Sequence, residues 1–149
     1  MAKRSSHPLL SHADGIAAGI ADPLLLIGRV LIAAMFLFTV WFGSPTVAYL
    51  TSINYVSPDV WSPIAQAVEW IIVISLVLGL GTRYGALLGL VFVIVATVTA
   101  HRYWGYPQAA QLMQYTFGVK NLAAAGGLIL LFVTGAGSIS VDSILASKR

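Results

Sequence analysis

Four uninterrupted apolar runs, each close to the length of a membrane-spanning helix, constrain this chain more than any other feature. They cover residues 23–42, 61–80, 84–100 and 117–134. A helix needs about 20 apolar residues to cross a hydrocarbon core of about 30 Å. A transmembrane barrel would instead need segments of alternating polarity, each about ten residues long. The runs therefore predict an all-α integral membrane protein, built as a bundle of four transmembrane helices.

The composition of the 149-residue chain agrees with a membrane protein, because 58% of its residues are hydrophobic and only 9% are charged. Soluble proteins carry about 25% charged residues. The basic residues are scattered beside apolar runs, so we expect the lipid bilayer, and not a nucleic acid, as a partner. Without cysteine, the chain cannot hold an iron–sulfur cluster on thiolates, and no metal ligands cluster at helical spacing. We expect no covalently bound cofactor, and electrons carried by another protein.

The lysine and arginine residues predict the orientation. In a four-pass chain only Arg102 clearly lies on one side, whereas the other side carries Lys3, Arg4, Arg83, Lys148 and Arg149. The positive-inside rule then places both termini in the cytoplasm, in an inner membrane of the bacterial type. An interfacial aromatic belt is expected at the opposite ends of the helices, formed by Trp41, Tyr49, Tyr55, Trp61, Tyr103, Trp104, Tyr106 and Tyr115.

The apolar runs divide the chain into a cytoplasmic N-terminal tail at 1–22, the four-helix transmembrane domain at 23–134 and a cytoplasmic C-terminal tail at 135–149. Asp22 is expected to cap the first span, with Pro23 at its first helical position. The N-terminal tail either is disordered or forms a short helix on the membrane surface, because one helical stripe contains Leu9, Ala13, Ile16 and Ile20.

Small residues predict where the helices pack closely. Gly85 and Gly89 form a small-x-x-x-small face on the third helix, and residues 123–127 read AAAGG on the fourth. Apolar helices in lipid associate through small residues that let their backbones approach. We interpret these faces as packing inside the bundle, with dimerisation as the alternative.

Glu69 is the most informative residue, because it stands alone among apolar residues about 12 Å below Trp61. An ionised group at that depth costs at least about 2.5–3.5 kcal/mol. Glu69 must therefore be protonated, be paired or line a wet cavity. Lys120 of the fourth helix descends from the same side and is a candidate partner. The two residues either form a charge pair that fixes the helix register or form a proton-active or ligand-binding site.

Further polar residues gather at the same end of the bundle, and they comprise His101, Arg102, Trp104, Gln114 and Asn121. Around a carboxylate in the membrane, such residues could bind a polar head group with an apolar tail, as in a quinone. The alternative is an ordinary anchor at the membrane interface, where Trp, His and Arg gather anyway. His101 is the stronger functional candidate. Arg29, near the other end, is expected to extend to the cytoplasmic surface.

These motifs together resemble the DoxX family of small four-helix membrane proteins, over about residues 25–142. The resemblance rests on LLLIGRVLIAAMFLF in the first helix, VEWIIVISLVLGLGTRYGALLGL across the second and third, AHRYW, VKNLAAAGGLILL in the fourth helix, and SVDS near the end. Glu69, His101 and Trp104 match the polar signature of the family, as do the pairs Thr82-Arg83 and Lys120-Asn121. Family members often carry a lysine shortly after the first helix, where this chain has Ser44 and Pro45.

The resemblance implies an association with membrane redox systems. It leads to the hypothesis of a quinone-proximal or anchoring subunit of a membrane redox complex, with a quinone as its possible cofactor and no turnover of its own. One alternative is a purely structural accessory subunit that docks a larger membrane assembly. A small transporter is the other alternative, although one buried charge pair is little support for a transport path.

Overall fold

The computed structural model describes residues 8–42 and 45–148, with side chains in the first stretch from residue 14 onward. This part of the chain is helical and contains no strand. Four helices are long and apolar enough to cross a membrane, which confirms the predicted four-helix class. They are α2 (Ala21–Trp41), α4 (Pro58–Leu78), α5 (Thr82–Thr99) and α6 (Gln108–Thr134). The short helices are α1 (Pro8–Gly19), α3 (Val47–Ser52), η1 (Tyr103–Gly105) and α7 (Val141–Ala146).

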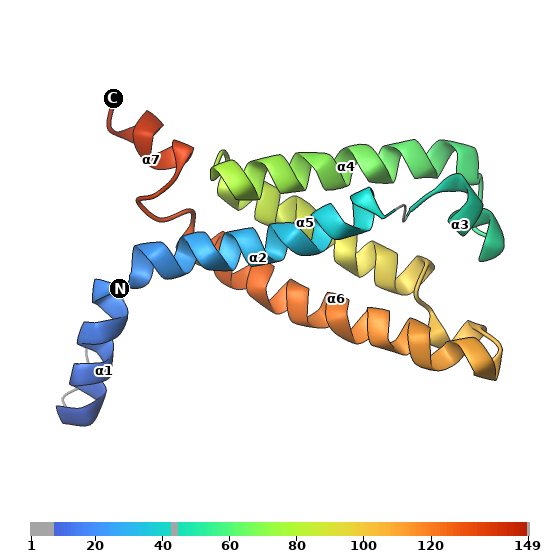
Figure 1. Ribbon diagram of the computed structural model, residues 1–149, viewed down its shortest axis with the longest axis horizontal. Helices are drawn as coiled ribbons and strands as arrows, with labels where there is room; N and C mark the ends of the chain where they lie inside the picture. The colour runs from blue at the N-terminus through green and yellow to red at the C-terminus, as the bar shows by residue number, and fades with distance from the viewer. Residues whose placement is uncertain (1–7, 43–44, 149) are drawn as a thin grey trace.

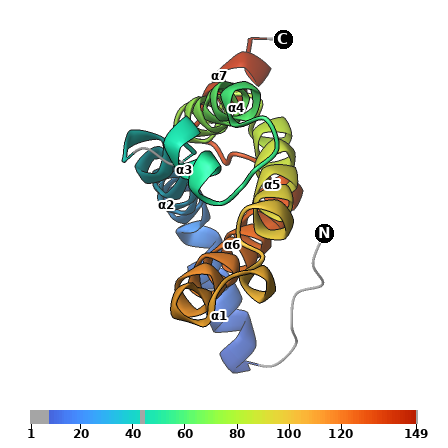
Figure 2. The same ribbon diagram turned by 90° about the vertical axis from the view of Figure 1, so that its right-hand side faces the viewer.

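The four long helices surround a common interior (Figures 1 and 2). Helix α2 packs against α4, α4 against α5, α5 against α6, and α6 returns to α2. We call the end of the bundle that carries α3 and η1 the loop end, and the end near α1 and α7 the termini end. Helices α4 and α6 diverge toward the loop end (Figure 1). Which side of the membrane each end faces stays a prediction. Three of the basic residues behind that prediction, Lys3, Arg4 and Arg149, lie outside the described residues. Ser44 also lies outside them.

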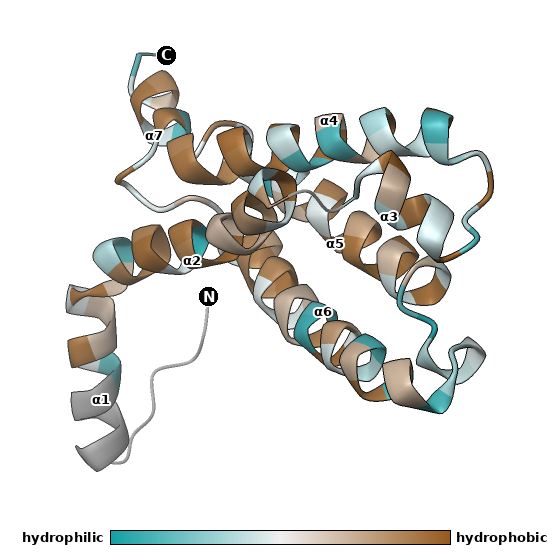
Figure 3. Cartoon of the chain, turned by 45° about the vertical axis from the view of Figure 1, so that its right-hand side comes forward, coloured by the Kyte–Doolittle hydropathy of each residue, from teal (hydrophilic) through white to brown (hydrophobic). Residues whose placement is uncertain are grey.

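Most residues of the four long helices are hydrophobic (Figure 3), and many of their large apolar side chains are exposed, as on a lipid-facing surface. Large side chains such as Leu31, Leu122 and Leu130 are more than two-thirds exposed. The core lies between the helices, where all four contribute buried apolar residues. Its members are Ala33, Phe36, Ile72, Val73, Leu76, Ala86, Val93, Ala125, Leu128 and Leu131.

The small residues on α5 and α6 pack inside the bundle. A β-carbon on Gly85 would collide with the Ser75 side chain of α4, and one on Gly89 would lie 3.1 Å from Leu128 of α6. A β-carbon on Gly127 would come within 3.0 Å of Ile32 on α2. These contacts confirm the interpretation as internal packing for Gly85, Gly89 and Gly127, whereas a β-carbon on Gly126 would meet nothing within 4 Å.

Two predicted helix starts are wrong. Helix α2 begins before Asp22, at Ala21, and its N-cap Ile20 makes no side-chain cap. The Asp22 carboxylate instead accepts hydrogen bonds from the backbone N–H and hydroxyl of Ser138, at 2.8 and 2.6 Å. Helix α6 begins nine residues before the expected Phe117. The preceding segment is more polar than a membrane span but contains no helix-breaking residue after Pro107, so the helix continues through it.

Residues 8–19 form helix α1, and the placement of the N-terminal tail on the membrane surface stays a prediction. Helix α1 lies at a steep angle to α2 and points away from the bundle (Figure 1). Ile16 and Ile20 are exposed, whereas the side chains of Leu9 and Ala13 lie outside the described part of the chain. An exposed apolar stripe on such a helix suits the membrane surface.

The C-terminal segment is docked on the bundle. We call residues 135–147 the C-terminal strap. The Asp142 carboxylate accepts hydrogen bonds from the backbone N–H groups of Gly81 and Thr82, at 2.7 and 3.0 Å. The backbone N–H of Asp142 donates to the Gly79 carbonyl oxygen at 2.9 Å. Together with the contact between Asp22 and Ser138, these bonds fasten the strap over the termini end.

Candidate functional site

One stripe of α4 carries polar side chains into the interior of the loop-end half. Ser62, Gln66 and Glu69 follow each other at spacings of four and three residues, which places them on one helix face. The Ser62 hydroxyl donates to the Pro45 carbonyl oxygen at 2.8 Å, and Nε2 of Gln66 donates to the same oxygen at 3.2 Å and to the Ser62 hydroxyl at 3.0 Å. The stripe thereby ties α4 to the segment before α3.

Glu69 is at the deep end of this stripe and is 1% exposed. Its Oε2 atom is buried and has no hydrogen-bond partner among the described residues. Deeper along α4, the buried side chains are Ile72, Val73 and Leu76, which belong to the apolar core, and Ser75, whose hydroxyl donates to the Leu80 carbonyl oxygen at 2.8 Å. Glu69 is therefore the boundary between a polar and an apolar part of the bundle interior.

His101 and Gln114 meet at the loop end. Nδ1 of His101 lies 2.9 Å from Oε1 of Gln114, which is only 2% exposed. Because a carbonyl oxygen only accepts, the neutral ring donates from Nδ1 and keeps Nε2 as an acceptor. The ring also lies against Phe117, with 5.2 Å between ring centroids. The structure thus brings together two residues that the sequence proposed for one site.

Lys120 is exposed along much of its length, and its Nζ atom lies 5.6 Å from the centroid of the Phe117 ring. Its charge is close enough to act electrostatically on both Glu69 and His101. The contact with Phe117 is a cation–π contact at the long end of its useful range. Lys120 therefore belongs to the same region as Glu69.

Tyr49 joins this region although the sequence analysis assigned it to the aromatic belt. Thr46 caps α3 by accepting a hydrogen bond from the Tyr49 backbone N–H at 3.1 Å, and this short helix carries the phenol into the mouth of the bundle. The hydroxyl is buried without a geometrically formed hydrogen bond in the described part of the chain, although the Gln114 side chain is nearby. Burial and the nearby Tyr106 raise the pKa of the phenol above its ordinary value, and Gln114 opposes this rise. A six-residue helix has too few residues to show a helical period, so no local signal identified Tyr49.

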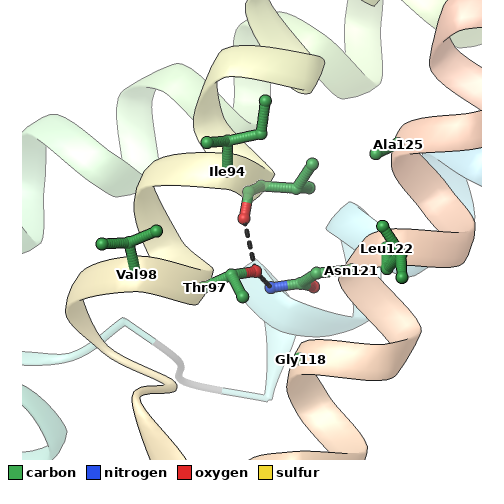
Figure 4. Close-up of a pocket in the computed structure, with 8 residues that line it drawn as sticks. Ile94, Thr97, Val98, Gly118, Asn121, Leu122 and Ala125 are labelled. Carbon is green, nitrogen blue, oxygen red and sulfur yellow. Dashed lines mark hydrogen bonds between the residues drawn. The ribbon is translucent and has the colours of Figure 1, made fainter.

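We call the set Tyr49, Gln66, Glu69, His101, Gln114 and Lys120 the interior cluster. Three further predicted residues lie outside it. Nδ2 of Asn121 donates to the Thr97 hydroxyl at 3.0 Å (Figure 4), and Thr97 in turn donates to the Val93 carbonyl oxygen at 2.7 Å. Asn121 thereby joins α6 to α5, beside a small pocket of about 140 Å³.

Arg102 and Trp104 are on the surface of the loop end. Trp104 is 63% exposed and makes an edge contact with Tyr103, with 5.2 Å between ring centroids. Arg102 is exposed, and its side chain lies beside Gly105. Both positions suit the interfacial anchor that the sequence analysis kept as an alternative.

A cavity of about 520 Å³ lies between α3, α4 and α5 at the loop end. Its walls are almost entirely apolar and include Leu50, Ala65, Val68 and Phe92. Ala65 and Val68 directly precede Gln66 and Glu69, so the cavity lies about 100° around α4 from the polar stripe. An apolar cavity with a few polar groups beside it is the usual form of a small-molecule site.

The comparisons with known proteins agree with the fold and with the sequence resemblance. The profile of the DoxX family matches residues 24–102 of this chain. The chain belongs to the DoxX family. It is similar to the inner membrane protein YphA of Escherichia coli (strain K12), with 34% identity over 132 residues. The aligned residues cover 83% of this chain and 92% of the relative. With its four candidate spans, this DoxX protein is a multi-pass protein of a bacterial-type inner membrane. No solved structure matches it.

The DoxX profile covers Glu69, His101 and Arg102 but ends before Gln114, Lys120 and Asn121. The interior cluster thus combines residues from the matched segment with residues from α6. Among the described residues, no group of His, Asp and Glu side chains is arranged to hold a metal ion.

Arg29 of this DoxX protein is buried, and the expectation that it extends to the cytoplasmic surface is wrong. It is 1% exposed, and its Nη2 atom donates a hydrogen bond to the Ile139 carbonyl oxygen of the C-terminal strap. A β-carbon on Gly79 would collide with its guanidinium group. Nε and Nη1 have no hydrogen-bond partner among the described residues, although the charge of Asp142 acts on the guanidinium. The strap covers Arg29 and prevents it from reaching the surface.

Proposed function

We propose that this DoxX protein is a quinone-proximal subunit of a membrane redox complex and that its interior cluster binds the quinone head group. The observation that carries the proposal is a pair of buried oxygens without hydrogen-bond partners in the described residues, Oε2 of Glu69 and the hydroxyl of Tyr49. Leaving such an atom unpaired costs about 1–3 kcal/mol. A guest that offers both acceptors and donors would relieve this cost.

The residues of the interior cluster suit the two chemical forms of such a head group. Tyr49 and Lys120 can donate hydrogen bonds to carbonyl oxygens, and His101 can do so from Nε2 when its ring is protonated. The Glu69 carboxylate can accept a hydrogen bond from a hydroxyl group. A bound quinone would supply the two-electron chemistry.

The apolar tail of the quinone fits the 520 Å³ cavity between α3, α4 and α5. This volume is within the range of about 300–1,000 Å³ that small-molecule pockets occupy. Its walls offer apolar contact to a flexible chain. The Tyr55 hydroxyl, at its edge, already donates a hydrogen bond to the Thr99 hydroxyl at 3.1 Å, so these two polar groups have a partner within the protein. The cavity would therefore select for an apolar tail.

Binding of a quinone with a decyl tail to the purified protein in lipid nanodiscs tests the proposal. Tyr49→Phe removes one hydrogen bond worth about 0.5–1.5 kcal/mol, so the Kd should rise about 2- to 13-fold. Glu69→Gln should weaken binding of the quinol form in particular. Tyr103→Phe, at an exposed tyrosine, is the matched control and should bind as the wild type does. Equal binding by all variants, or equal competition by decylbenzene, would overturn the proposal.

A structural accessory subunit is the second candidate, and the electrostatic proximity of Lys120 to Glu69 favours it. In that case the two charges only fix the register of α4 against α6. The double variant Glu69→Leu with Lys120→Leu should then restore the stability lost in each single variant and leave assembly and quinone-linked activity intact. Under the quinone proposal, the double variant assembles with its partners but loses quinone binding.

A further inference from the structure

Along α4, the side chains that face the bundle interior change from polar to mainly apolar at Glu69. On the loop-end side of Glu69, Gln66 lies three residues away along α4 and Ser62 lies four residues beyond it. At these spacings the β-carbons of neighbouring side chains are about 5–6 Å apart. Ser62 bonds to the Pro45 carbonyl oxygen, outside the long helices. The buried hydroxyl of Tyr49 is at the same end. Polar groups thus follow one another from Glu69 to the loop end, at distances that single water molecules bridge.

On the termini side, the interior is closed by apolar side chains. Phe36, Ile72, Val73, Leu76 and Leu128 are each at most 6% exposed and form one cluster. From Glu69 to Leu76 this layer extends about 10 Å along α4. Native cores of this kind are close-packed and leave few voids as large as a water molecule. The hydroxyl of the buried Ser75, at the termini side of this layer, donates to the Leu80 carbonyl oxygen. Among the described residues, no chain of polar groups therefore leads a proton from Glu69 through the layer.

The titratable groups near Glu69 all belong to the loop-end side. Lys120 on α6 acts electrostatically on Glu69 and on His101, which lies beyond the end of α5. Tyr49 on α3 lies near Tyr106 and near Gln114, the partner of His101. The ionisable groups of the termini end lie beyond the apolar layer: Asp22 and Arg29 on α2, Arg83 and Tyr84 on α5, and Asp142 and Lys148 in the C-terminal segment. On α4 itself, Asp59 is exposed at the loop end. No titratable group within the described helices bridges the two sets.

We infer that Glu69 is a proton-exchange site with one-sided access, open to the compartment at the loop end and sealed from the compartment at the termini end. The reaction is the reversible addition of a proton to the carboxylate and needs no other reactant. The inference does not depend on a quinone, because it rests on the polar stripe and the apolar layer alone. It also predicts that the chain by itself does not conduct protons across the membrane.

Infrared spectroscopy on vesicles of uniform orientation tests this inference. Glu69 is the single glutamate of the chain, so isotope-labelled glutamate assigns its carbonyl band in the unmutated protein. The vesicles hold different pH values inside and outside, and each side is titrated in turn without quinone. We expect the band of the protonated carboxyl group to follow the pH at the loop end only. A band that follows the other side, both sides or neither would overturn the inference.

The route to Glu69 is tested by Gln66→Leu, which interrupts the polar stripe. The variant should slow the response of the Glu69 band to a pH jump at the loop end and leave its end point unchanged. Gln108→Leu, an exposed position at the start of α6, is the matched control and should respond at the wild-type rate. An unchanged rate in Gln66→Leu would refute the proposed route. Because no quinone is present, these outcomes are independent of the quinone-binding test.

Discussion

Replacing Asp142 by Asn should release the C-terminal strap without unfolding the bundle. The Asp142 carboxylate accepts backbone hydrogen bonds from Gly81 and Thr82, at 2.7 and 3.0 Å, where α5 begins. Asparagine has nearly the same shape, but one of the two accepting oxygens becomes an NH₂ group that faces a backbone N–H. The variant therefore removes one charge-assisted hydrogen bond and the negative charge at the helix N-terminus.

The magnitude follows from these two losses. A hydrogen bond to a charged group contributes about 1.5–3 kcal/mol, and a negative charge at a helix N-terminus about 0.3–1 kcal/mol. Asp142 is only partly buried, so solvent reduces both contributions, and we expect a net loss of about 1–3 kcal/mol. The loss applies to local opening of the strap, because the four-helix core does not involve Asp142.

The pH dependence has a definite sign. Burial raises the pKa of the Asp142 carboxyl group, but the hydrogen bonds from the Thr82 and Gly81 N–H groups and the charge of Arg29 outweigh it, so the pKa is lower than in an unfolded chain. The carboxylate therefore stabilises the docked strap fully above about pH 3.9, the ordinary aspartate pKa, and this contribution is lost as the pH falls through the lowered value. Asp142→Asn should not show this acid-dependent step.

Hydrogen–deuterium exchange of the strap measures both effects. A loss of about 1–3 kcal/mol should speed exchange in residues 135–147 of Asp142→Asn by about 5- to 150-fold, with little change in α4 and α6. Asp14→Asn, at an exposed position on α1, is the matched control and should leave exchange unchanged. Wild-type exchange rates in the strap of Asp142→Asn would refute the capping role of Asp142.

The other predictions concern packing, backbone conformation and topology. Gly85→Ala should destabilise the bundle by about 1–3 kcal/mol, because the added β-carbon collides with α4. Gly126 faces open space, so Gly126→Ala should be neutral or stabilise the bundle by up to about 1 kcal/mol. Equal effects of the two variants on thermal unfolding would contradict the packing. Gly79→Ala should cost at least about 1–2 kcal/mol, because Gly79 has a φ of +66° and packs on a guanidinium group. In the cysteine-free chain, Asn54→Cys should react with an impermeant thiol reagent applied from outside intact cells, and Ser147→Cys should not. Labelling of Ser147→Cys but not Asn54→Cys would refute the predicted orientation.

The transmembrane helices could be predicted because each carries its own signal, a run of apolar residues as long as the membrane is thick. The start of α6 could not, because the glutamines before Phe117 are polar yet compatible with a helix. Asp22 fitted a local capping pattern, but its carboxylate binds Ser138, 116 residues away. A contact between residues so far apart in the sequence produces no periodic pattern near either residue from which the contact could be predicted.

The same distinction applies to the candidate site. Glu69 could be identified because a single carboxylate in an apolar run must have a special environment, and His101 because it ends a span beside other polar residues. Tyr49 could not be distinguished from the aromatic belt, since only the short helix α3 turns its phenol inward. Arg29 could not be recognised as buried, because the strap that covers it lies 110 residues further along the chain.

Glu69 and Arg29 are two buried charged side chains at different levels of one bundle, and the space beside them differs. Around Arg29, the strap and Gly79 fill the surroundings so closely that a β-carbon on Gly79 would collide with it. Beside Glu69, Ala65 and Val68 of α4 line a 520 Å³ cavity, and the Lys120 side chain is exposed. A buried charge enclosed by its own chain fastens the fold, whereas one that adjoins free volume can take up a guest or a proton. This difference is why we place binding at the loop end and anchoring of the strap at the termini end.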